Sequence, residues 1–176
     1  MSIGPSQKRL LAQGGIFGAL AFVAGVLLVF PILLAAGGLL GAQTRALPLV
    51  MAAFGYMVLH AWPVLYGFPP AMLALAVVPA GLLTAVGYVT ARRTAALETP
   101  GRYRGAAVVV GYLPVTAIAF AYVLVRPRLS AAGGDGAVTT LATLDPGFVV
   151  ASVGYTGILF PVIFGGLGGF VAERRD

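Results

Sequence analysis

Long apolar runs without charged side chains alternate with short polar stretches along the whole chain. Four such runs cover residues 16–40, 71–91, 105–125 and 149–171. A hydrocarbon core about 30 Å thick needs roughly 20 apolar helical residues to cross it. The pattern therefore predicts an all-α protein, a polytopic transmembrane helical bundle with four spanning helices, in which residues 1–176 form a single transmembrane domain.

A fifth apolar stretch, residues 47–68, is harder to assign. It contains Tyr56, Trp62 and Tyr66, which belong to the aromatic types that gather at the membrane–water boundary. Two consecutive prolines, Pro69 and Pro70, directly follow it, and a proline disfavours helix at the residue before it. We therefore expect an interfacial or re-entrant helix at the outer face, and a fifth span is the alternative.

The distribution of positive charge favours four crossings over five. The chain has eleven Lys and Arg against five Asp and Glu, and the basic residues lie in short clusters beside the apolar runs. With four crossings and the N-terminus inside, the cytoplasmic set is Lys8, Arg9, Arg92, Arg93, Arg102, Arg104, Arg174 and Arg175. Only Arg45, Arg126 and Arg128 then lie outside, in accord with the positive-inside rule.

This charge pattern also predicts where the protein resides. We expect a multi-pass plasma-membrane protein with both termini in the cytoplasm and an external loop over residues 126–147. Six arginines should flank the cytoplasmic lipid surface, namely Arg92, Arg93, Arg102, Arg104, Arg174 and Arg175. Because the positive charges flank apolar spans instead of covering a soluble face, nucleic-acid binding is not expected.

Small residues recur at four-residue spacing in several runs. Such pairs allow helix backbones to approach closely, and packing in lipid depends on that approach. The glycines concerned are Gly14, Gly18, Gly25, Gly37, Gly41, Gly111, Gly165 and Gly169. These faces are expected either to pack the chain's own helices, or to dock another subunit, a second copy or a flat apolar ligand.

His60 is the only histidine, and the chain contains no cysteine. A metal site in one chain needs several ligands, and no apolar run contains an acidic residue. We therefore expect no metal and no cofactor, with His60 as a polar boundary residue beside Trp62. A haem shared between two chains through His60 is the remote alternative.

The five acidic residues, Glu98, Asp135, Asp145, Glu173 and Asp176, all lie in predicted loops or the C-terminal tail. General acid–base catalysis needs a titratable pair within reach of the substrate, so an enzyme is not expected. The first hypothesis is a non-catalytic accessory or scaffold subunit of a larger membrane complex, in contact with lipids and with other subunits or itself.

Two further hypotheses compete with the accessory role. One is a small homo-oligomeric channel or carrier for a neutral or apolar solute, and the other is a haem-linked electron-transfer subunit that uses His60. A channel or carrier would need polar residues along one helix face. The candidates for such a face are Thr84, Thr116, Ser152, Thr156 and the tyrosines of the spans.

Overall fold

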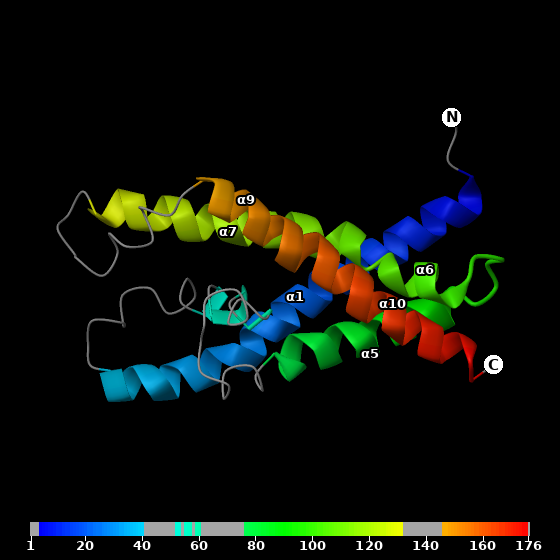
Figure 1. Cartoon of the computed structure of the whole chain (residues 1–176), viewed down its shortest axis with the longest axis horizontal. Helices are drawn as coiled ribbons and strands as arrows, with labels where there is room; N and C mark the ends of the chain where they lie inside the picture. Colours follow the sequence, from blue (N-terminus) through cyan, green and yellow to red (C-terminus); the bar gives the residue numbers. More distant parts are fainter. Residues whose placement is uncertain are drawn as a thin grey trace.

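The computed structural model describes residues 4–40, 52–53, 55–57, 59–60, 76–131 and 146–175. Every regular element in these ranges is a helix (Figure 1). Three helical stretches, Pro5–Pro31, Gly101–Tyr122 and Val150–Glu173, are long and apolar enough to cross a membrane. For the described residues, the prediction of an all-helical chain with helices apolar enough to span a membrane is confirmed.

The count of four spans stays a prediction. The second expected span, residues 71–91, corresponds to helix α5, whose bounds are Val77–Arg93. This helix has 17 residues, slightly fewer than a single crossing usually needs.

Helix α1 extends over Pro5–Leu40 and therefore begins well before the apolar run that predicted it. Pro5 lies at the start of the helix. Backbone N–H groups have no helical acceptor at this position, so the N–H that proline lacks costs no hydrogen bond. The helix continues through Pro31. Gly37 lies in this last part of α1, and Gly41 lies outside the described residues.

The third expected span is built from two helices. The short helix α6, Gly101–Ala106, is followed directly by α7, Val109–Ala131, after a tight turn at Ala107 and Val108. The helix α7 extends to Ala131, so it enters the range expected to form an external loop. The rest of that range up to residue 145 lies outside the described residues.

The last span contains a π-helical turn. Helix α9, Pro146–Gly154, continues into the turn η2, Tyr155–Leu159, and then into α10, Phe160–Glu173. In a regular α-helix the ring of Pro161 would clash with the carbonyl group of Gly157, four residues earlier. The wider turn directly before Pro161 relieves that clash, and the Phe160 N–H donates to the Tyr155 carbonyl, five residues earlier.

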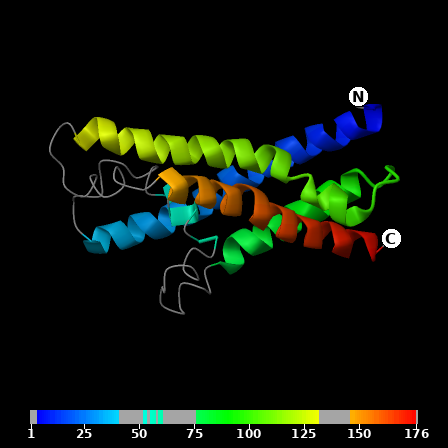
Figure 2. The ribbon, with the colours of Figure 1, turned by 45° about the horizontal axis from the view of Figure 1, so that its top comes forward.

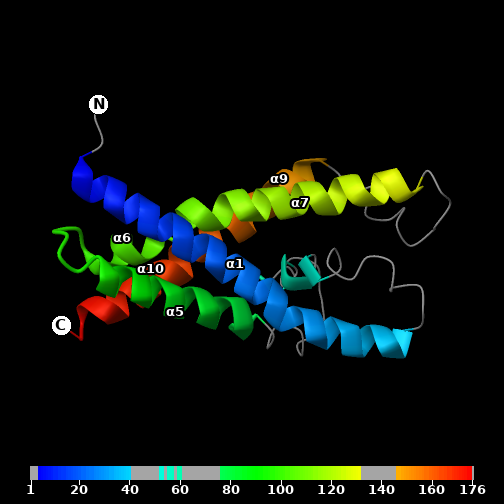
Figure 3. The same cartoon turned by 180° about the vertical axis from the view of Figure 1, so that it is seen from behind.

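The helices form an elongated bundle (Figures 1 and 2). Helix α10 packs against α5 and α6, and α1 packs against α7 and α5, crossing both obliquely (Figure 3). The N-terminus, the C-terminus and the turn between α5 and α6 all lie at the same end (Figures 1 and 2). The three clusters of basic residues expected in the cytoplasm therefore share one end of the bundle.

Most of the predicted packing glycines contact the chain's own helices. A side chain on Gly18 would overlap the Val108 carbonyl oxygen, and one on Gly111 would overlap the Gly15 carbonyl oxygen, where α1 crosses α7. Gly14 contacts the backbone of Ala107 in the same way, Gly165 contacts both Gly87 and Gly105, and Gly169 contacts Gly101. These glycine faces are therefore occupied within the chain.

One of the arginines expected beside lipid lies inside the protein. Arg104 is buried, and its guanidinium donates to the Ala91 carbonyl oxygen over 3.1 Å. A positive charge is favourable at this place because Ala91 lies in the last turn of α5, where carbonyl groups lack helical donors. The other five arginines of the predicted set are exposed. Three of them lie over aromatic rings: Arg93 over Phe17, Arg102 over Tyr103 and Arg174 over Phe170.

Candidate functional site

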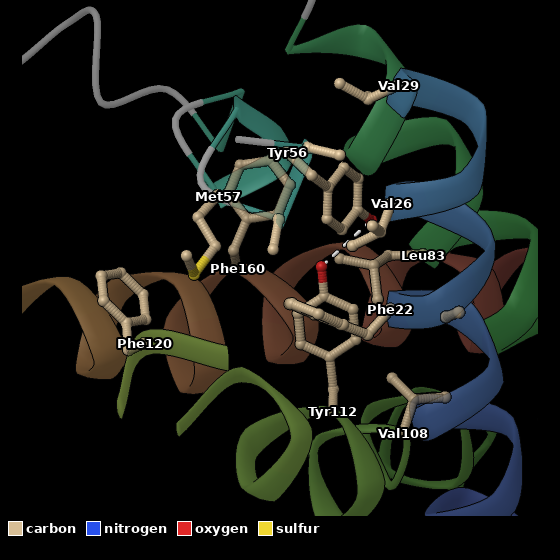
Figure 4. Close-up of a cluster of buried hydrophobic side chains, with 13 residues drawn as sticks. Phe22, Val26, Val29, Tyr56, Met57, Leu83, Val108, Tyr112, Phe120 and Phe160 are labelled. Carbon is tan, nitrogen blue, oxygen red and sulfur yellow. Dashed lines mark hydrogen bonds between the residues drawn. The ribbon is translucent and has the colours of Figure 1, made fainter. Parts of the chain in front are cut away.

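The described part of the segment 47–68 packs inside the bundle. Its helical residues Ala52, Ala53, Tyr56 and Met57 are buried in one core cluster with residues of α1, α7 and α10 (Figure 4). These described residues belong to the core instead of lying on the surface of the bundle, and the re-entrant helix and the fifth span stay predictions. Trp62 and Tyr66 lie outside the described residues.

Tyr56, predicted as a boundary aromatic, is not on the surface of the bundle, because its side chain is 0% exposed. Gly25 of α1 makes room for it, since a side chain on Gly25 would overlap the Tyr56 ring. Phe22, one turn earlier on α1, contacts the rings of both Tyr56 and Tyr112 edge to face, at centroid distances of 5.5 and 5.4 Å. The spacing of Gly25 and Phe22 on one face of α1 therefore positions the two tyrosines.

Tyr56, His60 and Tyr112 form a hydrogen-bonded network, which we call the His–Tyr network. The His60 Nδ1 atom lies 2.9 Å from the Tyr56 carbonyl oxygen, and its Nε2 atom lies 2.5 Å from the Tyr112 hydroxyl. The hydroxyls of Tyr112 and Tyr56 are 3.1 Å apart (Figure 4). All three side chains are completely buried.

One arrangement of protons satisfies the network with a neutral imidazole. The carbonyl oxygen of Tyr56 can only accept, so His60 Nδ1 carries the proton and donates it. The Nε2 atom then accepts from the Tyr112 hydroxyl, whose oxygen in turn accepts from the Tyr56 hydroxyl. The hydrogen bonds thus run from the Tyr56 hydroxyl through Tyr112 and His60 back to the Tyr56 carbonyl oxygen. They link α7, which contains Tyr112, to the buried segment that contains Tyr56 and His60.

This geometry changes both interpretations of His60. The prediction that His60 is a solvated boundary residue is wrong, because its ring is buried and contacts the Phe160 ring at a centroid distance of 4.8 Å. As a haem ligand it would need a free ring nitrogen, and both nitrogens are hydrogen bonded within the chain. Among the described residues, no three His, Cys, Asp or Glu side chains group together as metal ligands would.

Further buried hydroxyls lie on α7 and on the helix that packs against it around the π-helical turn. Thr116 follows Tyr112 by one helical turn on α7, and a side chain on Gly157 would be in contact with it. Ser152 and Thr156, one turn apart on the opposing helix, are buried as well. Thr84 is separate from them, since it lies on α5 and donates to the Ala80 carbonyl oxygen.

An apolar groove of about 500 Å³ lies between α1 and α7, and Phe22 is one of the residues that line it. Val23 and Leu27 of α1 and Ile118 and Tyr122 of α7 line it and are exposed. Phe22 and Ala53, both buried, line it further inside. The sequence pattern did not reveal this groove, because it depends on the crossing of two helices about 90 residues apart in the chain.

The comparisons with known proteins give one match. A model of the family of unknown function DUF7978 matches residues 62–176, which include α5, α6, α7, α9 and α10. Tyr112 lies within the matched range, and Tyr56 and His60 lie just before it. Neither the curated proteins nor the solved structures contain a match. Since the matched range covers more than half of the sequence, the chain belongs to the DUF7978 family.

Proposed function

We propose that the protein is a non-catalytic membrane protein that binds the hydrocarbon part of a lipid-phase molecule in the groove between α1 and α7. The groove is the observation that supports this role most directly. Its volume of about 500 Å³ lies within the range of small-molecule sites. Among the functions considered from the sequence, this one corresponds to the carrier of an apolar solute.

The position of the groove determines the chemistry of its occupant. The two helices that form it belong to stretches able to cross a membrane, so the groove opens sideways toward lipid. Its exposed edges are Val23, Leu27 and Ile118, which offer no hydrogen bond. Tyr122 is the polar group at the edge, and a ligand with an apolar chain fits such a lining.

The first hypothesis from the sequence, an accessory subunit that docks through small-residue faces, loses its main support. Gly18 and Gly111 contact the opposing backbones of α7 and α1, and Gly165 contacts α5 and α6. A partner would need these faces free. The groove, and not the glycine faces, therefore supports a role in binding an apolar molecule.

Filling the groove should prevent ligand binding. We expect Ala119→Phe, which places a ring in the groove, to reduce photolabelling by a long-chain fatty acid carrying a diazirine by about tenfold, because the ring occupies the space of the chain. The measurement is the amount of probe on α1 and α7 after reconstitution in liposomes, read by mass spectrometry.

Ala85→Phe is the matched control, because Ala85 is exposed on α5, which does not line the groove. Labelling in this variant should equal that of the wild type. Labelling spread evenly over all lipid-facing helices, with no loss in Ala119→Phe, would show that the groove holds no preferred ligand.

We also propose a plasma-membrane location with cytoplasmic termini, because the basic clusters share one end of the bundle. The native chain has no cysteine, so single cysteines report topology cleanly. Ser6→Cys and Ala95→Cys, both exposed at the basic end, should be protected from an impermeant maleimide in intact cells. Gly147→Cys, exposed at the start of α9, should be labelled. The reverse pattern would show the opposite orientation.

A further inference from the structure

The groove between α1 and α7 lies away from the basic end of the bundle. Both helices run from that end toward the opposite end (Figures 1 and 3). On α1 the groove is lined from Phe22 to Leu27. At roughly 1.5 Å per residue, these two positions lie about 20 and 27 Å from Arg9 along the helix. Because the hydrocarbon core is about 30 Å thick and helices tilt by about 20°, both positions lie beyond its midplane.

The residues of α7 locate the far boundary of the membrane independently. On this helix the groove is lined from Val115 to Tyr122, and Arg126 follows one turn later, within the bounds of α7. A charged side chain is costly and rare in the hydrocarbon core, so the core is expected to end between Tyr122 and Arg126. Tyrosine is enriched at this level of a membrane. Tyr122 therefore marks the membrane–water boundary at one end of the groove.

The lining of the groove is apolar near the midplane and offers a hydroxyl at the boundary. The ring of Phe22 contacts that of Tyr112, one turn before Val115, so Phe22 lies at the end nearer the midplane. Phe22 is buried, whereas Tyr122 is 43% exposed. Among the described residues that line the groove, Tyr122 alone has a side chain that forms hydrogen bonds. This order of polarity matches an amphiphile whose polar group lies at the boundary.

We propose that the groove holds an acyl chain of a glycerolipid from the leaflet remote from the basic end, with the ester carbonyl bound by the Tyr122 hydroxyl and the chain end toward Phe22. This inference rests on the proposed function, because it names the molecule that binds there and its direction. Lipids of that leaflet have their ester groups at the boundary and their chain ends at the midplane, in the same order as Tyr122 and Phe22. A lipid of the other leaflet would bring only its chain end to the groove.

The direction of the bound chain can be measured on the wild-type protein. Two phosphatidylcholine probes are reconstituted with it in liposomes, one with a diazirine beside the ester group and one with a diazirine at the chain end. After irradiation, mass spectrometry should find the first probe mainly on Leu27 and Tyr122 and the second mainly on Phe22 and Val115. An equal distribution of the two probes, or the inverted order, would overturn the proposed direction.

Removing one hydroxyl tests the bond to the ester group. Tyr122→Phe keeps the ring and deletes the donor, so labelling by the ester-side probe should fall about threefold, as the loss of one hydrogen bond predicts. Tyr103→Phe is the matched control, because Tyr103 is an exposed tyrosine of α6 outside the groove, and its labelling should equal that of the wild type. Undiminished labelling in Tyr122→Phe would show that the hydroxyl does not bind the lipid.

The proposed function and the glycerolipid can fail separately. If the fatty acid probe labels the groove and Ala119→Phe prevents it, but neither phosphatidylcholine probe labels the groove, the binding role stands and the glycerolipid is wrong. If no probe labels the groove, both are overturned. Disulfide formation between two copies of Ile118→Cys, an exposed lining position, would then show that a second copy of the chain covers the groove.

Discussion

Replacing Gly87 by alanine is expected to lower the free energy of unfolding by about 1–3 kcal/mol. Gly87 lies where α5 crosses α10, and an added Cβ would lie 2.6 Å from the Cα and 2.7 Å from the carbonyl carbon of Gly165. Both are backbone atoms, so no flexible side chain can move aside and the helices must separate. The measurement is unfolding in mixed detergent and SDS micelles, followed by the fluorescence of the single tryptophan.

Gly81→Ala is a matched control in the same helix. Gly81 is exposed on α5, and an added Cβ would meet no atom within 4 Å. Alanine is favoured over glycine in a helix interior by up to about 1 kcal/mol, so this variant should be equally or more stable than the wild type. Equal stability of the two variants would mean that the contact between Gly87 and Gly165 does not limit how closely α5 and α10 approach.

The positions of the helices could be predicted from the sequence, but their contacts could not. Apolar length is a local property, and α5, α7 and the last span overlap the runs that predicted them. The spacing of Gly14, Gly18 and Gly165 indicated close packing, yet it did not reveal which helix each one meets. That choice depends on residues far apart in the chain, such as Gly18 and Val108.

The candidate site illustrates the same limit. The aromatic residue types and the nearby prolines led to the prediction that Tyr56 and His60 lie at the membrane–water boundary. Both signals describe only the local segment and say nothing about distant partners. The partner of His60 is Tyr112, 52 residues later in the sequence. From the sequence alone, a buried polar side chain with a distant hydrogen-bond partner cannot be distinguished from a polar side chain that is exposed. One signal was available, since Gly25 and Phe22 together form a recess on α1 that accepts an aromatic ring.

Removing the His60 ring should produce the second large loss of stability. His60→Ala leaves the Tyr112 hydroxyl without its acceptor and opens a cavity beside Phe160, at an expected cost of about 2–4 kcal/mol. Tyr112→Phe leaves the His60 Nε2 atom without its donor and should cost about 1–3 kcal/mol. Tyr103→Phe is the control, because Tyr103 is 56% exposed and its change should stay within about 0.5 kcal/mol.

Combining the two changes distinguishes a network from separate contacts. Because His60 and Tyr112 are partners, the double variant should lose at least about 1 kcal/mol less than the sum of the single losses. Amide hydrogen exchange should also increase in the buried segment around Tyr56 and His60 while α10 stays protected, since the His–Tyr network links that segment to α7. Additive losses, or an equal increase in exchange along α10, would mean that the segment is held by apolar packing alone. The buried polar groups would then have no part in fixing its position.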